Sequence, residues 1–440
     1  MDQKDRINLC EWVLEHAIHC GANQADVSLS NAKIVEIEFC NKQLEKLKKS
    51  TQNSLNLALY INQKYSLQST NDLRKELLKN FIEQALTATK YLEKDKFRSL
   101  PEWKYYPGRT RPDLKICDSG YNNIKSKERI NFASTIEASA MIQSNKIIST
   151  TAYYQDKYTQ AVKMHSTGFL GESRTTSYGA GAEVTVKDDK EGRPEDWYYA
   201  RTRFYNTLPS PEFLGKQAAM RALRKIGQQK IKSGIYDMLV ENRAGRTLIS
   251  MLQGPMQARY LQQRNSYLEN MLGKCIASEN LTFIDDPTLY NGLASRHYDA
   301  EGLAAKKRTI IEKGILKNYY IDNYYGKKLN MEATSGSTSN LIFRVGEESQ
   351  ESLIKDMKRG ILVTEFIGGN SNNTTGDFSF GVAGLLIEDG EVIKPVNEMN
   401  ISGNAKEFWK RLSVIANDSY PYSSWRIPSM LFEKVHFSGL

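Results

Sequence analysis

Histidine and cysteine occur at metal-ligand spacing in the segment EHAIHC, residues 15–20. His16 and Cys20 are four residues apart, so they share one face of a helix, and imidazole with thiolate is a donor pair that zinc accepts. His19 is a further candidate donor. The alternative is a last helical turn before Gly21, in which the histidines lie at the negative end of the helix and Cys20 packs inside. We favour this structural role, so no metal site is predicted here.

A second candidate pair is His297 and Glu301 in HYDAEG, whose H-x-x-x-E spacing would bring two ligands together on a helix. Glycines at positions 292 and 302 predict a loop or strand end instead. Cys275 could act as a nucleophile only with a base such as His297 within hydrogen-bond reach, and the sequence does not bring the two together. His165 and His436 fit surface or hydrogen-bonded core positions.

Serine and glycine motifs of familiar active sites do not occur. Ser166 and Ser379 belong to no G-x-S-x-G pattern, and the run GAGAEV, residues 179–184, lacks the third glycine of a dinucleotide-binding loop. No Walker A sequence occurs. The sequence therefore predicts neither a serine nucleophile nor a nucleotide site of these kinds.

Carboxylates cluster at Asp285-Asp286 and at Asp299 with Glu301. Paired carboxylates can bind cations or share a proton. An Asp-Asp-Pro sequence is more often a turn whose side chains accept hydrogen bonds from nearby backbone amides. We therefore assign these four residues a structural role.

Composition is that of a folded globular protein. The chain has 440 residues, of which 40% are hydrophobic and 25% charged, which predicts two or three packed units. Its net charge of +9 allows an anionic partner, but the basic runs are short and no nucleic-acid motif occurs, so nucleic-acid binding is not predicted. No apolar run is long enough to span a membrane, and the charged start MDQKDRINLCEW does not fit a signal peptide. The five cysteines include no C-x-x-C pair, which favours reduced thiols and a cytoplasmic protein.

Periodicity divides the chain into three units and a linker. Residues 1–100 read as helix, strands and helix, and residues 113–233 repeat that order, with separate strand-like runs at 147–154 and 159–167 and an N-cap at Ser210. An internal duplication would explain the repeat. The segment PEWKYYPGRTRP, residues 101–112, holds three of the eleven prolines and reads as a linker. Residues 234–440 form many short strands separated by turns, including Asp389-Gly390. The predicted class is α+β, with a mostly antiparallel C-terminal β domain.

Longer motifs follow one another along the C-terminal half. They are SYLENMLGKCIASENLTFIDDPTL, HYDAEGLAAKKRTIIEKGILKNYYID, GILVTEFIGG, TTGDFSFGVAGLLIEDGEVIKPV and the terminal FSGL. In these motifs and their order the chain resembles the TldD/PmbA family, and within it the TldE (PmbA) branch. Weaker matches in the N-terminal half are GANQADV, STGFLGESRTTSYGAGAEV and PEFLGKQAAMRALRKIG. The resemblance thus covers almost the whole chain.

The resemblance implies a cytoplasmic peptidase system in which a TldD-like subunit pairs with a TldE-like subunit. The family is also known as modulators of DNA gyrase and is associated with microcin maturation and with proteolysis of unfolded or small peptides. In the TldD-like subunit a helix just after an A-G pair carries H-E-x-x-x-H, and a cysteine near the C-terminus completes the zinc site.

The segment RAGRTLISMLQGPMQA, residues 243–258, corresponds to that helix. When Ala244-Gly245 is set against the family's A-G pair, the ligand and base positions fall on Ile249, Ser250 and Gly254. No His, Glu, Asp or Cys occurs between Gly245 and Tyr260, and the segment NDSYPYSSWRIP, residues 417–428, has no cysteine. Because zinc binding needs such donors, the resemblance predicts a subunit without a metal or catalytic residues of its own.

Our hypothesis is therefore a TldE-like, non-catalytic subunit that pairs with a zinc-bearing TldD-like partner and holds an extended peptide by strand addition. Position in the matched motifs suggests two groups of peptide-binding or interface residues: Arg264, Ser266 and Tyr267, and Asp377, Phe378 and Ser379. The alternative is a stand-alone binding or scaffold protein, as a homodimer, without peptidase activity.

Overall fold

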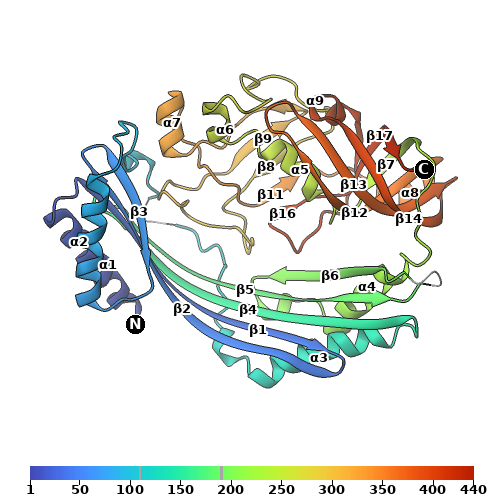
Figure 1. The fold of residues 1–440 in the computed structure, drawn as a ribbon, viewed down its shortest axis with the longest axis horizontal. Coiled ribbons are helices and arrows are strands. Elements are labelled where there is room, and N and C mark those ends of the chain that lie inside the picture. The colour runs from blue at the N-terminus through green and yellow to red at the C-terminus, as the bar shows by residue number, and fades with distance from the viewer. Residues whose placement is uncertain (109–110, 189–191) are drawn as a thin grey trace.

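The computed structural model describes residues 1–108, 111–188 and 192–440, and it has the predicted α+β class with mostly antiparallel sheets (Figure 1). One six-stranded sheet is built from the N-terminal half, and a five-stranded and a second six-stranded sheet from the C-terminal half. Residues 109–110 of the predicted linker lie outside the described residues.

The N-terminal sheet is antiparallel, in the order β3-β2-β1-β4-β5-β6. Its strands are β1 (Gln24–Cys40), β2 (Gln43–Ile61), β3 (Lys64–Thr70), β4 (Ile147–His165), β5 (Leu170–Val186) and β6 (Glu195–Thr202). β1 and β4 pair along most of their length, from Asp26 opposite His165 to Cys40 opposite Thr151. The units predicted at 1–100 and 113–233 therefore contribute to one continuous sheet, and their boundaries stay a prediction.

Four helices cover the convex face of this sheet (Figure 1). They are α1 (Gln3–His19), α2 (Lys75–Lys90), α3 (Ser126–Met141) and α4 (Pro211–Leu223). α1 and α2 pack over one end of the sheet and α3 and α4 over the other, each pair with its own hydrophobic cluster. Local signals set the helix ends: the Ser210 hydroxyl accepts a hydrogen bond from the Phe213 amide, as the predicted N-cap requires.

β4 corrects the prediction of two separate strands at 147–154 and 159–167. A polar stretch divides the two runs in the sequence, but β4 continues through it, paired with β1 on one side and β5 on the other, and Asp156 within it is fully buried. Its carboxylate accepts hydrogen bonds from Arg129 Nε at 2.5 Å and from the Tyr121 hydroxyl at 2.8 Å. A buried charge with such partners is compatible with a central strand.

The C-terminal half contains both remaining sheets. The five-stranded sheet has the order β10-β9-β8-β11-β16, and the six-stranded sheet has the order β14-β13-β12-β7-β17-β15, with β14 also paired to β17. The strands are β7 (Gly234–Val240), β8 (Phe283–Asp285), β9 (Arg308–Glu312), β10 (Ile315–Leu316), β11 (Leu341–Phe343), β12 (Arg359–Ser371), β13 (Asp377–Glu388), β14 (Glu391–Asn404), β15 (Leu412–Ile415), β16 (Trp425–Arg426) and β17 (Met430–Ser438). The helices are α5 (Arg246–Gln253), α6 (Ala258–Gln262), α7 (Asn323–Leu329), α8 (Gln350–Asp356) and α9 (Ala405–Phe408). The predicted hairpin turn Asp389-Gly390 joins β13 to β14, with φ of 48° and 80°.

Ion pairs join the two halves. Arg221 of α4 makes a bidentate contact with Glu241, just after β7, at 2.8 Å for both N–O pairs. Lys225 binds Glu365 of β12 at 2.7 Å. These contacts hold the C-terminal domain over the concave side of the N-terminal sheet (Figure 1). Across the described residues, no helix combines the length and apolar character needed to cross a membrane.

Candidate functional site

Helix α5 is the segment that the sequence comparison singled out. Its apolar face is buried, and Ile249 is 0% exposed within the main core of the C-terminal domain. Ser250 is exposed, and its hydroxyl donates to the carbonyl oxygen of Arg246 at 2.9 Å. Gly254 ends the helix, and a Cβ placed there would lie 3.0 Å from Oδ1 of Asn373.

The residues on α5 do not fit a zinc ion. Zinc in proteins is held by Cys, His, Asp or Glu. Here Ile249 has an alkyl side chain inside the core, Ser250 has a hydroxyl, and Gly254 has no side chain. Structural zinc contributes about 10–16 kcal/mol of binding free energy through such donors. α5 therefore has no means of activating a water molecule through a metal.

An open cleft of ≈ 650 Å³ adjoins the C-terminal end of α5. We call it the amide cleft because amide and hydroxyl side chains dominate its lining: Tyr260, Asn265, Asn370, Ser371, Asn372, Asn373, Thr374, Asp377, Phe378 and Ser379. The side chain of Asn373 lies next to Gly254, the C-cap of α5, and so places the cleft at this end of the helix. Amides and hydroxyls both donate and accept hydrogen bonds, as binding to a peptide backbone requires.

Three of the predicted peptide-binding residues line the amide cleft, namely Asp377, Phe378 and Ser379. The Asp377 carboxylate accepts hydrogen bonds from the Thr375 hydroxyl at 2.6 Å and from the Asn404 amide at 2.8 Å. These hydrogen bonds hold the pKa of Asp377 below its usual value. The cleft therefore presents a fixed negative charge at the start of β13.

The other three predicted residues lie beside the cleft in different environments. Arg264 is exposed, with a positive φ of 56°. Ser266 and Tyr267 are buried, and their hydroxyls donate to the carbonyl oxygens of Pro255 and Met251 at 2.7 and 2.9 Å. Ser266 and Tyr267 thus brace the segment around α5, and Arg264 is the one of the three that faces solvent.

A second cleft, of ≈ 440 Å³, adjoins the N-terminal end of α5, and the sequence patterns did not indicate it. We call it the cationic cleft, after Lys157 of β4, Arg201 of β6 and Arg246 of α5 in its lining. Arg246 stacks on Trp425 at 4.2 Å from the ring centroid. Among the described residues no acidic side chain pairs with any of these three cations. They come from distant segments, so only the folded sheet brings them together.

The four acidic residues assigned a structural role each accept a hydrogen bond from a backbone amide. Asp285 binds the Ser339 amide at 2.8 Å and Arg308 at 3.1 Å. Asp286 accepts from the Thr288 amide at 2.9 Å. Asp299 caps the Leu303 amide at 3.0 Å, and Glu301 accepts from the Asn323 amide at 2.7 Å.

Glu301 has a further property, because it lines a cavity of ≈ 460 Å³ between the N-terminal sheet and the C-terminal domain. Burial raises its pKa to about 7, and the nearby carboxylates of Asp299 and Asp322 act in the same direction. Arg98 lines the same cavity, stacked 3.5 Å from the Tyr324 ring centroid. The raised pKa of the Glu301 carboxyl group was not evident from the sequence.

The remaining candidates are mostly separated. His297 lines a different cavity from Glu301, of ≈ 600 Å³, and Cys275 donates instead to the Ala277 carbonyl oxygen. His165 is buried against the Tyr106 hydroxyl at 2.9 Å, and His436 is exposed on β17. Within the described part of the chain, only His16 gathers other metal-ligating groups around it.

Comparison with known proteins agrees with this architecture. Residues 233–439 match the PmbA/TldA metallopeptidase C-terminal domain, and residues 121–226 match the central domain of the same family. The "Metalloprotease PmbA homolog" of Haemophilus influenzae is 27% identical over 433 residues, covering 97% of this chain and 95% of that protein. A crystal structure from Bacteroides thetaiotaomicron, described as a "putative modulator of DNA gyrase", is 36% identical over the full length of both chains, with a TM-score of 0.97. TldE from Thermococcus kodakarensis shares the fold at a TM-score of 0.86 and 20% identity, covering 98% of this chain and 100% of that one.

These relatives define a class of metalloprotease homologues with this three-sheet fold. The chain belongs to the PmbA/TldD family.

Proposed function

We propose that this chain is a TldE-like, non-catalytic subunit that binds a zinc-bearing TldD-like metallopeptidase and holds extended peptide for it. What supports the proposal is the composition of α5, where Ile249, Ser250 and Gly254 fall at the positions that the resemblance to the TldD-like subunit assigns to the metal ligands and the base. Metal-dependent peptide hydrolysis then has to come from a partner, because α5 has no His, Cys, Asp or Glu to hold a metal ion that would activate a water molecule.

The two clefts support a role in peptide binding. The amide cleft offers hydrogen-bonding side chains beside the bulged end of β12, where the pairing with β13 is interrupted between Ile367 and Asn370. The cationic cleft lies along β6, an end strand of its sheet, and offers a carboxylate three cations that form no ion pair with an acidic side chain of the described residues. A peptide that added to an exposed strand edge could use both features.

The distance between the clefts gives a length for such a peptide. Arg246 begins α5 and lines the cationic cleft, and Gly254 ends α5 at the amide cleft. Eight helical residues rise about 12 Å, which about four residues of extended peptide span. We therefore propose short, acidic or carboxylate-terminated segments of unfolded protein as the preferred ligands.

The test is co-purification with the TldD-like protein of the same organism, followed by peptide-cleavage assays of this chain, the partner and the pair. We expect cleavage by the pair, its loss when the first histidine of the partner's H-E-x-x-x-H is changed to alanine, and no effect of Ser250→Ala. Chelator-sensitive cleavage by the isolated chain would overturn the proposal. A homodimer that neither binds the partner nor alters its cleavage would favour the scaffold alternative.

A further inference from the structure

We propose that His16, Cys20 and Glu83 form a binding site for a divalent transition-metal ion, with zinc as the best fit. The site lies where α1 meets α2 on the outer face of the N-terminal sheet. In Figure 1 these helices are at the opposite end of the molecule from β12 and β13. This inference is therefore independent of the proposed function.

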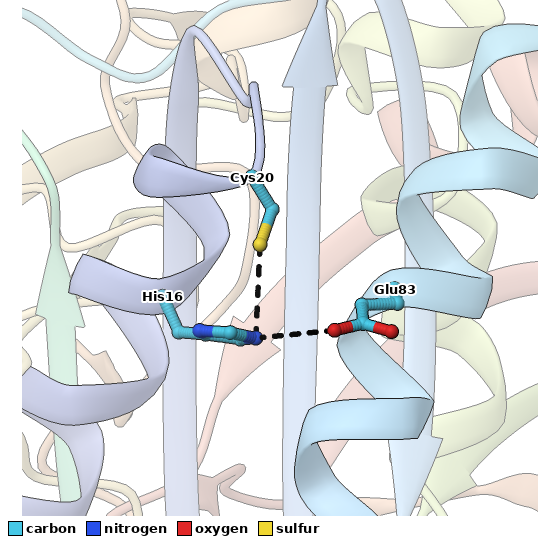
Figure 2. A group of neighbouring side chains, drawn as sticks. All are labelled: His16, Cys20 and Glu83. Carbon is cyan, nitrogen blue, oxygen red and sulfur yellow. Dashed lines mark hydrogen bonds and ion pairs between the residues drawn. The ribbon is translucent and has the colours of Figure 1, made fainter.

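The donor atoms are already close together (Figure 2). Nε2 of His16 lies 3.7 Å from Sγ of Cys20 and 3.8 Å from Oε1 of Glu83, and all three donors lie within 4.8 Å of one another. Bond lengths of about 2.0–2.3 Å in a tetrahedral zinc site place donor atoms about 3.4–3.6 Å apart. The two distances from His16 Nε2 exceed this range by a few tenths of an ångström, and side-chain movements of up to about 1 Å would bring all three donors to one ion.

The fold supplies these donors from two well-anchored helices. His16 and Cys20 are one helical turn apart, and Cys20 is the C-cap of α1. The His16 ring stacks in parallel on Trp12, with ring centroids 5.4 Å apart and planes 6° apart, which restrains its orientation. α1 and α2 share one hydrophobic cluster, so the position of Glu83 relative to His16 is set by the core beneath them.

The chemistry of the donors selects the kind of ion. One imidazole nitrogen, one thiolate and one carboxylate oxygen are all accepted by zinc, whereas the thiolate disfavours magnesium and calcium. The two anionic donors would balance the charge of a divalent ion. The Cys20 thiol would lose its proton to solvent on binding.

Exposure at the site allows an ion to enter and leaves room for a fourth ligand. The His16 side chain is 17% exposed and that of Glu83 is 50% exposed. A water molecule would complete the tetrahedron without any rearrangement of the helices. A simple ion pair between protonated His16 and Glu83 is the competing explanation, and it requires nothing of Cys20.

The experiment is a cobalt titration of the full-length, chelator-treated and reduced protein, followed by displacement of cobalt with zinc. We expect one cobalt per chain at this site, with the sulfur-to-cobalt charge-transfer absorption and the d–d bands of four-coordinate geometry. Cys20→Ser removes the charge-transfer band. His16→Ala and Glu83→Gln each weaken cobalt affinity by at least about 10-fold, the lower end of what even an indirect ligand partner contributes.

Matched controls come from the same two helices. His19→Ala and Glu76→Gln change exposed residues of α1 and α2 outside the cluster, and we expect them to bind cobalt as the unaltered chain does. Circular dichroism of each variant checks that the fold is intact. The proposal is overturned if the unaltered protein lacks the charge-transfer band, if Cys20→Ser retains it, or if the controls lose as much affinity as the cluster variants.

Discussion

Glu301 makes the stability of this protein fall as pH rises, and the substitution Glu301→Gln tests this dependence. Its carboxyl group lines the cavity between the two halves, and burial raises its pKa from 4.5 to about 7. Between these pH values the Glu301 carboxyl group is therefore protonated in the folded state and ionised in the unfolded state. The Glu301 contribution to the free energy of unfolding must fall as pH rises from about 4.5 to about 7.

The size of the effect follows from the pKa difference. A difference of about 2.5 pKa units corresponds to about 3 kcal/mol as an upper value, because one unit is 1.36 kcal/mol. Glu301→Gln keeps an oxygen that can accept from the Asn323 amide but cannot ionise. The variant should match the unaltered protein near pH 4.5 and exceed its free energy of unfolding by up to about 3 kcal/mol above pH 7.

Urea unfolding of both proteins at a series of pH values measures this difference. The difference between the two proteins is the useful quantity because His165 acts in the opposite direction: burial lowers its pKa to about 3, so its contribution to stability rises with pH between about 3 and 6.5. Glu332→Gln, at an exposed position, is the control and should give a flat difference curve. The reasoning is refuted if the Glu301→Gln curve is flat, or if the variant loses stability relative to the unaltered protein as pH rises.

Three further predictions concern the strands and clefts. Asp156→Asn leaves Arg129 without its buried partner and should lower the free energy of unfolding by about 3–5 kcal/mol, measured by denaturant titration; a loss below about 1 kcal/mol would contradict the role assigned to this pair. Gly369→Ala should destabilise the protein more than Gly368→Ala, since both have positive φ but only the first would bring a Cβ within 2.2 Å of a backbone oxygen; equal effects on the melting temperature would contradict the steric argument. Arg246→Gln should weaken binding of a short acidic peptide to the subunit pair by about 10-fold, measured by fluorescence anisotropy, and should have little effect on a neutral amide-capped peptide of the same length; an equal loss for both would contradict carboxylate recognition.

Helix α5 is held in the fold by its apolar face and carries no metal-ligating side chain. The fold keeps this helix because its apolar face packs in the core, with Leu248 and Ile249 both 0% exposed. Packing needs only the apolar face, whereas metal binding needs donors at particular positions. The helix can therefore serve as a scaffold without any metal-ligating side chain.

Short-range features of this protein were determined by the sequence alone. Hydrophobic period and capping predicted the helices and the α+β class, the N-cap at Ser210 and the turn at Asp389-Gly390, because each depends on residues a few positions apart. The lack of metal ligands on α5 could also be read directly, since it concerns which residue types are present. His16 and Cys20 could be paired for the same reason, being one helical turn apart.

Only the tertiary structure decided what depends on contacts between distant segments. It joined β1 to β4 in one sheet, carried β4 through the buried Asp156, and brought Glu83 to His16 from a different helix. It also assembled the cationic cleft from β4, β6 and α5. Periodicity reports which face of an element is buried but not which element covers it, so partners across the sheet and the linings of clefts emerge only when the chain packs.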